Sequence, residues 1–276
     1  MEYIEVNVHG LSGDNAGILT AEMCELGFES FTEESGGIFS AYIPLGSFDS
    51  IKVANFLEKK AAKLGFRYKV ETITGQNWNA VWESAYQPVR IGKCFIRAPF
   101  HEPDPAASLD LVIEPKMSFG TAHHETTHLM IEALLQISFG GSTVLDMGTG
   151  TGVLAIIAAK LGAKHVVAID NDEWSFLNAK ENALRNNVPG VLVIHGDAAD
   201  IPAGKYGFIF ANINRNVLLR DIPVYHGFLE DGGFLITSGF YEEELGAIKE
   251  KTAALGMKQT QLDTLNHWAA VRFKKC

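Results

Sequence analysis

The first 75 residues alternate between apolar patterns of two periods. Residues 3–8 read YIEVNV, and this alternation of apolar and polar positions is typical of a half-buried β-strand. Other apolar residues recur at helical spacing and stop at Gly27 and Gly65, which favours two α-helices. In chain order the pattern predicts a strand, a helix, two strands, a helix and a strand over residues 3–8, 14–26, 28–34, 38–44, 48–64 and 66–73. This order indicates a small ferredoxin-like α+β domain.

A different pattern follows this domain. Trp78, Trp82 and Tyr86 recur every four residues, which predicts one aromatic stripe along a short helix. Three prolines between residues 99 and 105 then indicate an irregular connection. We therefore expect a domain over residues 1–75, a linker helix and connection over 76–100, and a second domain over 101–276.

From residue 143 onward, continuous apolar runs alternate with helical patterns. Such runs predict parallel strands that are buried on both faces of a sheet, with helices between them. The last two runs, over 257–265 and 267–275, flank Asn266 and favour an antiparallel hairpin at the sheet edge. The second domain is therefore expected to have an α/β fold.

The composition narrows the class of protein. Of the 276 residues, 47% are hydrophobic and 20% are charged, as in ordinary soluble proteins. The start of the chain lacks the pattern of a signal peptide, and no apolar run approaches the length of a membrane span. Three widely spaced cysteines suit a reducing compartment. We expect a cytoplasmic protein, without a membrane association, that acts as a monomer.

The net charge of the chain limits the kind of partner that it can bind. A net charge of -10 disfavours contact with a phosphate backbone, so no direct nucleic-acid binding is expected. Within the first domain the acids gather at Glu22, Glu25, Glu29, Glu33 and Glu34. This cluster is either a docking face for a basic partner or a solvated surface without a role.

One motif is typical of zinc enzymes. His124, Glu125 and His128 spell H-E-x-x-H, which on a helix places two imidazoles on one face beside a carboxylate. A catalytic zinc needs a third protein ligand, and no further ligand follows at the usual spacing. We therefore interpret the string as the polar start of a helix and expect no metal.

The stretch VLDMGTGTGVLAI carries the strongest signal. Gly148, Gly150 and Gly152 follow an expected strand and precede an expected helix, where glycines permit a sharp turn and a close approach of backbone N–H groups to a ligand. The position three beyond Gly150 is Val153, so the spacing departs from the dinucleotide fingerprint. A tight turn without a ligand is the plainer alternative.

Polar side chains end the next three strands. Asp170 is placed to accept hydrogen bonds from two ribose hydroxyls, and Asp197 to accept one from an adenine amino group. Asn212 ends the fourth strand, which should flank the same crevice as Gly148. Each residue alone could be a helix cap, but together the residues predict a nucleoside site.

The order of these motifs resembles the seven-stranded, Rossmann-like class I methyltransferases that use S-adenosyl-L-methionine. More narrowly, FGTAHHETT at 119–127 is similar to F-G-T-G-T-H-P-T-T of the bacterial methyltransferases of ribosomal protein L11. WNAVWESAYQPVRIG, ANI and HWAAVRFKK at 78–92, 211–213 and 267–275 are similar to their linker helix, fourth-strand end and last strand. The resemblance spans nearly the whole chain and includes the N-terminal domain, which in this family recognises the substrate.

By this resemblance, Thr127, Gly148, Asp170 and Asn212 occupy positions that contact the cofactor, and Gly150 and Asp197 complete our predicted site. Three positions depart from the family stretch: Ala122 replaces a glycine, His123 a threonine and Glu125 a proline. Because of the first two replacements, the family resemblance does not predict the shape of the loop that precedes the helix.

For a methyl transfer the protein mainly has to align the nucleophile, and an amine nucleophile must be neutral. The side-chain oxygen of Asn212 is our candidate for orienting that amine. Asn212 to Arg215 read N-I-N-R, not the N-P-P-Y of enzymes that modify base or amide nitrogens.

Three hypotheses follow from the sequence. The first is methylation of lysine ε-amines and the N-terminal α-amine of ribosomal protein L11. The second is a class I methyltransferase for another protein or a small-molecule amine, because a fold does not determine a substrate. The third is a nucleoside-binding or zinc protein that is not an enzyme.

Overall fold

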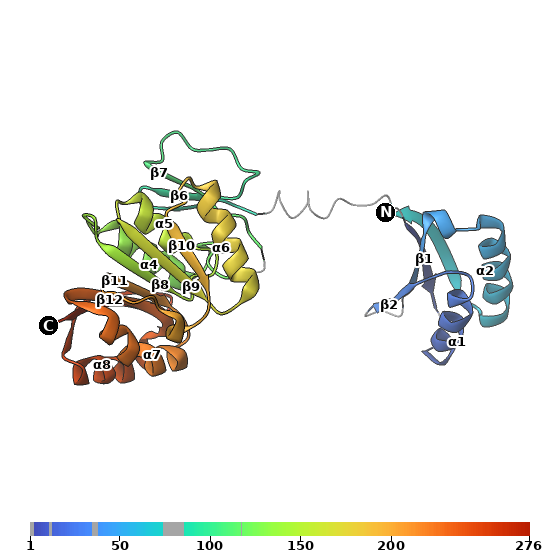
Figure 1. Ribbon diagram of the computed structural model, residues 1–276. Helices are drawn as coiled ribbons and strands as arrows, with labels where there is room; N and C mark the ends of the chain where they lie inside the picture. The colour runs from blue at the N-terminus through green and yellow to red at the C-terminus, as the bar shows by residue number, and fades with distance from the viewer. Residues whose placement is uncertain (1–2, 11–12, 35–37, 74–85, 117) are drawn as a thin grey trace. The chain divides into compact units, whose positions relative to one another are not determined.

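The computed structural model divides the chain into two compact units, Met1–Tyr86 and Gln87–Cys276 (Figure 1). The structure describes the whole chain except residues 1–2, 11–12, 35–37, 74–85 and 117. The predicted helix around Trp78 and Trp82 therefore lies outside the described residues.

The first unit is an antiparallel sheet of four strands in the order β2-β3-β1-β4, with two helices. Its elements are β1 (Tyr3–His9), α1 (Gly13–Cys24), β2 (Ser30–Glu34), β3 (Ile38–Pro44), the short 3-10 helix η1 (Leu45–Ser47), α2 (Ser50–Leu64) and β4 (Arg67–Ile73). In β1 every second side chain is buried, since alternate residues of a strand face opposite sides of its sheet. Asp49 caps the start of α2 by accepting from two backbone N–H groups.

The second unit contains a large mixed sheet, in the order β10-β9-β8-β11-β12-β14-β13. Its strands are β8 (Thr143–Met147), β9 (His165–Asp170), β10 (Val191–His195), β11 (Tyr206–Asn212), β12 (Leu229–Tyr241), β13 (Met257–Leu265) and β14 (Trp268–Lys275). The strands from β10 to β12 are parallel, and β14 is antiparallel to β12. The strand order reverses beside β8, so β9 and β11 flank it on opposite sides.

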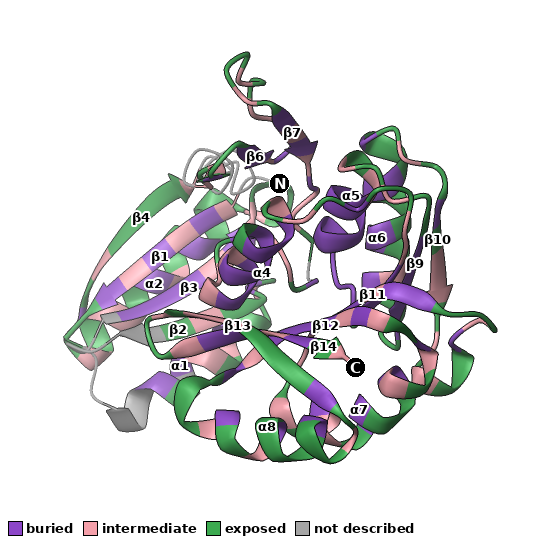
Figure 2. Ribbon diagram, turned by 90° about the vertical axis from the view of Figure 1, so that its left-hand side faces the viewer, coloured by how far each residue is buried: buried purple, intermediate pink, exposed green. Residues whose placement is uncertain are grey.

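Helices cover both faces of this sheet. They are α4 (Glu125–Leu135), α5 (Val153–Lys160), α6 (Glu173–Arg185), α7 (Arg215–Phe228) and α8 (Leu245–Ala254), with short 3-10 helices η2 (Ala198–Asp200) and η3 (Glu242–Glu244). One hydrophobic cluster joins α4, α5 and α6 to one face, and a second joins α7 and α8 to the other. Residues 153–158 of α5 are all buried, whereas α8 shows many exposed residues (Figure 2).

The last two strands form the predicted antiparallel hairpin. Asn266 and His267 connect them with φ angles of 48° and 70°. Two successive residues with positive φ characterise the tight turn that matches the twist of a two-stranded ribbon.

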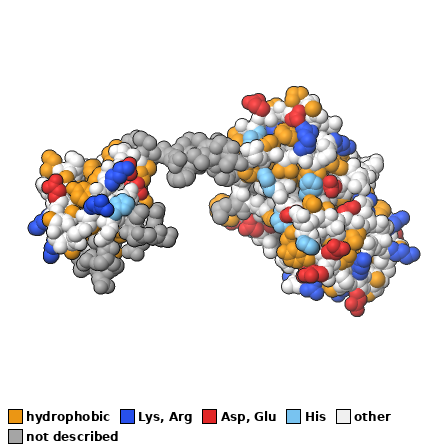
Figure 3. Space-filling model, turned by 180° about the vertical axis from the view of Figure 1, so that it is seen from behind, with side chains coloured by type: hydrophobic (Ala, Val, Ile, Leu, Met, Phe, Trp, Pro, Cys, Tyr) orange, Lys and Arg blue, Asp and Glu red, His pale blue; other side chains and the backbone are white. Residues whose placement is uncertain are grey.

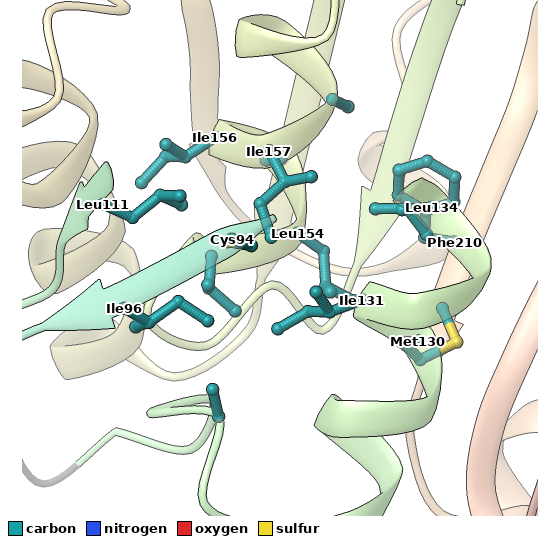
Figure 4. Close-up of a cluster of buried hydrophobic side chains, with 14 of the residues drawn as sticks. Cys94, Ile96, Leu111, Met130, Ile131, Leu134, Leu154, Ile156, Ile157 and Phe210 are labelled. Carbon is teal, nitrogen blue, oxygen red and sulfur yellow. The ribbon is translucent and has the colours of Figure 1, made fainter. Parts of the chain in front are cut away.

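A small sheet of three strands, β5 (Val89–Ile91), β6 (Cys94–Arg97) and β7 (Leu109–Val112), was not predicted from the sequence. Cys94 and Leu111 of this sheet pack in the same buried cluster as Ile157 of α5 and Ile131 of α4 (Figure 4). Burial raises the pKa of the Cys94 thiol to about 12. The second compact unit thus begins at Gln87 and includes strands within the range that we expected to be a connection.

One face of the second unit is mixed in charge (Figure 3). On the face seen in Figure 3, its lysine and arginine side chains are scattered among acidic, histidine and hydrophobic side chains. In the part of the chain that the structure describes, no helix combines the length and the apolar character that a membrane span requires.

Candidate functional site

The glycine loop between β8 and α5 depends on its three glycines. Gly148, Gly150 and Gly152 have φ angles of 70°, 57° and 82°, a region that side-chain-bearing residues rarely adopt. A Cβ atom on Gly150 would also clash with the carbonyl oxygen of Phe119, and one on Gly148 with the side chain of Ile213. The loop is therefore enclosed by the segment that precedes α4 and by the end of β11.

Asp170, at the end of β9, holds this loop in place. One carboxylate oxygen accepts a hydrogen bond from the backbone N–H of Gly150 at 2.8 Å, and the other accepts from Asp172 N at 3.0 Å. The side chain is 9% exposed. Each oxygen retains a lone pair, so the carboxylate can both brace the loop and accept from a ligand hydroxyl.

Asp146, inside β8, is a buried carboxyl that our site prediction did not include. Its Oδ2 accepts a hydrogen bond from Thr149 Oγ1 at 2.6 Å, whereas its Oδ1 has no partner among the described residues. Burial, to which the charge of Asp170 adds, raises the pKa of Asp146 to about 7. An acid within an apolar strand was the sequence signal for such a group.

A pocket of about 210 Å³ opens at this edge of the sheet. Three predicted residues, Gly148, Asp170 and Asp197, line it together. The apolar side chains of Ile169, Ile213 and Val217 also line it. A crevice with apolar walls and a few carboxylates suits a nucleoside, because the base needs apolar contact and the sugar needs hydrogen-bond acceptors.

Asp197 also has a structural role. Its Oδ1 accepts from the backbone N–H of Ala199 at 2.8 Å, while its own N–H donates to Asp200. These bonds cap the short helix η2. One carboxylate oxygen is thus used locally, and the other is available to a ligand amino group.

Helix α7 contributes residues to the pocket that the sequence did not reveal. Arg220, Asp221 and Tyr225 are among the residues that line the pocket. Asp221 accepts two hydrogen bonds from the Arg220 guanidinium, at 2.6 and 2.9 Å, and burial raises the pKa of Tyr225. No motif marks these residues, since they reach the pocket only through the packing of α7 on the sheet.

Asn212 and Thr127 form a second group beside the pocket. Asn212 Nδ2 donates to Thr127 Oγ1 at 3.4 Å, which joins the end of β11 to the first turn of α4. The Oδ1 atom of Asn212 is buried and has no hydrogen-bond partner among the described residues. A buried acceptor without a partner costs free energy, so its persistence here is consistent with a donor supplied by a ligand.

The H-E-x-x-H string has other contacts. His124 is the N-cap of α4, accepting from Thr126 N at 3.2 Å, and His128 lies 3.4 Å from Glu132. Glu125 accepts from Asn266 at 3.1 Å, and this bond lowers the pKa of the Glu125 carboxyl. Within the described residues, no three histidine, cysteine or acidic side chains are grouped to hold a metal ion.

The loop that departs from the family stretch is well packed. Ala122 adopts a φ of 68° and is 2% exposed, which shows that a methyl group is accommodated where the family has glycine. The ring nitrogens of His123 lie 2.9 Å from the carbonyl oxygen of Gln87 and 3.1 Å from that of Thr121. His123 thus ties this loop to the beginning of the second unit.

Three buried asparagines, two on α6 and one at its C-cap, also support the site. Asn186 pairs with both the N–H and the carbonyl of Val112, and Asn182 accepts from Glu114 N at 2.9 Å. The amide of Asn182 also donates to the carbonyl of Thr151 in the glycine loop at 2.9 Å. Asn178, the third, donates weakly to Glu114 O at 3.4 Å. The asparagines therefore connect the chain after β7 to the glycine loop.

Comparison with known proteins agrees with this geometry. The family model described as ribosomal protein L11 methyltransferase (PrmA) matches residues 20–276. A ribosomal protein L11 methyltransferase of Porphyromonas gingivalis is 45% identical over 262 residues, covering 93% of this chain and 89% of that protein. One from Phocaeicola vulgatus is 40% identical over 282 residues, covering 99% of both chains.

A solved structure supports the fold. The crystal structure of a ribosomal protein L11 methylase from Lactobacillus delbrueckii subsp. bulgaricus matches with a TM-score of 0.64 and 29% identity. The match covers 69% of this chain and 100% of that one. These findings confirm the predicted mixed α/β methyltransferase fold with a large central sheet, and they confirm the resemblance inferred from the motifs. The chain therefore belongs to the ribosomal protein L11 methyltransferase family.

Proposed function

We propose that this methyltransferase transfers methyl groups from S-adenosyl-L-methionine to lysine ε-amines, and to the N-terminal α-amine, of ribosomal protein L11. The observation that carries the proposal is the buried Oδ1 of Asn212 beside the glycine loop, which has no hydrogen-bond partner in the described part of the chain. An amine that enters this position supplies the missing donor, and its lone pair remains available for attack. The family membership supports the choice of ribosomal protein L11 as the substrate.

The residues at the sheet edge fit the cofactor. Gly148 and Gly150 present no side chain at their positions in the loop, Asp170 offers acceptors for the ribose and Asp197 offers one for the adenine amino group. When bound, the cofactor supplies an electrophilic methyl group on a positively charged sulfur. The role of the protein is to exclude water and to align the amine at roughly 3 Å from that methyl carbon.

Asn212 and Thr127 position the nucleophile in this scheme. Thr127 Oγ1 accepts from Asn212 Nδ2 and so fixes the amide, whose buried oxygen is the acceptor that we assign to the incoming amine. The amine must lose one proton to have a free lone pair, and the bound cofactor would supply the methyl group to that lone pair. A partly dry crevice disfavours the ammonium form and so favours this deprotonation.

The assay that tests the proposal mixes the protein, labelled S-adenosylmethionine and purified ribosomal protein L11. Label in ribosomal protein L11, mapped to lysine and N-terminal amines by mass spectrometry, is the expected result. Label transferred only to other proteins or to small amines would instead favour a class I methyltransferase with another substrate. Calorimetry with S-adenosylhomocysteine checks the cofactor site separately, and no binding at millimolar ligand would contradict any methyltransferase function.

Asp170→Ala should weaken binding of S-adenosylhomocysteine by about 1 to 3 kcal/mol, because it removes a charge-assisted acceptor and the brace on Gly150. Calorimetric titration measures the effect. The matched control is Asp231→Ala, which removes an exposed carboxylate elsewhere in the unit. An unchanged dissociation constant in Asp170→Ala would refute the assignment.

We also propose that residues 1–75 are a substrate-recognition domain, joined to the methyltransferase domain over 101–276 by residues 76–100. Deleting residues 1–75 should leave the affinity for S-adenosylhomocysteine within about twofold, since the pocket is built within the second unit. Transfer to ribosomal protein L11 should fall to background. Full activity of the truncated protein would contradict the docking role.

A further inference from the structure

Four aromatic rings form a continuous row on the second unit. Phe119 contacts His124 with ring centroids 5.2 Å apart, His124 contacts Trp268 at 4.8 Å, and Trp268 contacts Tyr241 at 4.1 Å. The two ends of the row are open to solvent, since Phe119 is 53% exposed and Tyr241 is 43% exposed. Packing of the core therefore does not account for these end residues.

A pocket of about 480 Å³ lies at the Tyr241 end of the row. Tyr241, Glu242, Glu243 and His267 line it. Glu242 and Glu243 are exposed, and neither forms an ion pair with another described residue. The pocket thus combines an aromatic ring with two carboxylates that form no ion pair within the described part of the chain.

The row begins at the glycine loop and passes close to the amine-orienting group. The carbonyl of Phe119 accepts a hydrogen bond from Thr151 N at 2.9 Å, and His124 lies in the same helical turn as Thr127, the partner of Asn212. Asn212 is in register with Ser238 of β12, and Tyr241 follows Ser238 by three residues on that strand. Three strand residues span about 10 Å, so the pocket lies within reach of a short peptide whose amine is at Asn212.

The chemistry of this surface selects a cation. The faces of tyrosine and tryptophan rings attract ammonium and guanidinium groups, and nearby carboxylates add a charge attraction that salt weakens. We propose that Tyr241, Glu242 and Glu243 form a subsite for a lysine or arginine of the protein substrate that lies a few residues from the methylated lysine. The inference rests on the proposed function. It adds that this surface of the second unit selects the sequence around the methylated lysine.

The experiment compares steady-state methylation of ribosomal protein L11 by the full chain and by the double variant Glu242→Gln/Glu243→Gln. The KM for the protein substrate should rise about fivefold at low salt, the scale of two exposed charge pairs, with kcat changed less than twofold. The difference in KM between the variant and the unaltered protein should shrink in 0.5 M salt, because salt screens the attraction between exposed charges. The dissociation constant of S-adenosylhomocysteine should not change.

The matched control is Glu230→Gln/Glu250→Gln, which removes two exposed carboxylates from other parts of the same unit. Its KM should equal that of the unaltered protein. A second variant, Tyr241→Leu, keeps an apolar side chain but removes the ring, and its KM should rise about threefold.

The outcomes separate this inference from the proposed function. If the unaltered protein methylates ribosomal protein L11 and the Glu242/Glu243 variant has a KM within twofold of it, the subsite is refuted and the function stands. An equal rise in the Glu230/Glu250 control would also refute the subsite, because the effect would then be one of net charge. If the unaltered protein transfers no methyl group to ribosomal protein L11, both the proposed function and the subsite fail.

Discussion

The two units of this protein bury polar side chains very differently. Among the described residues of the first unit, Ser40 is the polar side chain that is buried, and its hydroxyl donates to Asn7 at 2.6 Å. The second unit buries a group around the glycine loop, namely Thr126, Thr127, Asp146, Thr149, Thr151, Asp170, Asn178, Asn182 and Asn186. Buried polar groups are costly unless they are bonded, so they accumulate where a specific arrangement is needed.

The difference shows which unit depends on individual residues. In the first unit, alternation of apolar and polar positions is enough to build the sheet, and its core of aliphatic and aromatic side chains tolerates conservative exchange. In the second unit, the loop between β8 and α5 donates hydrogen bonds to Asp170 and to the carbonyl of Phe119, and it accepts one from Asn182. Substitutions of similar size should therefore have unequal effects in the two units.

The largest expected effect comes from glycines with positive φ. Gly150→Ala should destabilise the second unit by more than about 4 kcal/mol and abolish binding of S-adenosylhomocysteine, because the new methyl group meets the backbone of Phe119. The counterpart in the first unit, Gly65→Ala, has φ 75° and open space, so it should cost only about 1 kcal/mol. Thermal unfolding followed by circular dichroism measures both, and equal losses would contradict the enclosed loop.

The next effect is a dependence of stability on pH. The pKa of Asp146 is about 7 in the folded protein against an ordinary value of 3.8, so the folded state binds the proton more tightly. The protonated carboxyl therefore makes its full contribution to stability below about pH 4. As the pH rises to about 7 this contribution is lost, and the free energy of unfolding falls by at most about 4 kcal/mol.

Asp146→Asn should remove this slope. The unfolding transition of the second unit, identified by its shift with S-adenosylhomocysteine, should change less between pH 5 and pH 8 in the variant than in the unaltered protein. The transition of the first unit serves as an internal control, since its sequence is unaltered. Parallel pH profiles of the second unit in the two proteins would argue against a raised pKa.

The smallest of the three effects concerns the asparagines of α6. Asn182→Ala removes the bonds to Glu114 N and Thr151 O and leaves both backbone groups without this partner, so it should cost about 2 to 3 kcal/mol and weaken cofactor binding. Leu184→Ala on the same helix is 62% exposed and should change neither quantity. Ser40→Ala, the first-unit counterpart, should cost about 1 kcal/mol. Denaturant titration of the three variants checks this order, which a neutral Asn182→Ala would overturn.

Long, strongly patterned segments were predicted well from the sequence. The strands from β8 to β12 and the hairpin of β13 and β14 follow from apolar runs, because a strand that is buried or half-buried leaves such a pattern. The sheet of β5, β6 and β7 was missed, since strands of three or four residues among prolines leave too short a pattern. Asn178, Asn182 and Asn186 were missed because polar residues at helical spacing usually indicate a solvated face.

The sequence by itself determined the chemistry available at the sheet edge: alternate glycines in the loop, then Asp170, Asp197 and Asn212 at successive strand ends. These follow from the chain alone because the carboxyl ends of parallel strands meet at one edge. Only the tertiary structure decided how the groups are used. Asp170 braces Gly150, while one oxygen of Asp146 and the side-chain oxygen of Asn212 have no partner among the residues that the structure describes. Hydrogen bonds between distant residues depend on packing that no local pattern encodes.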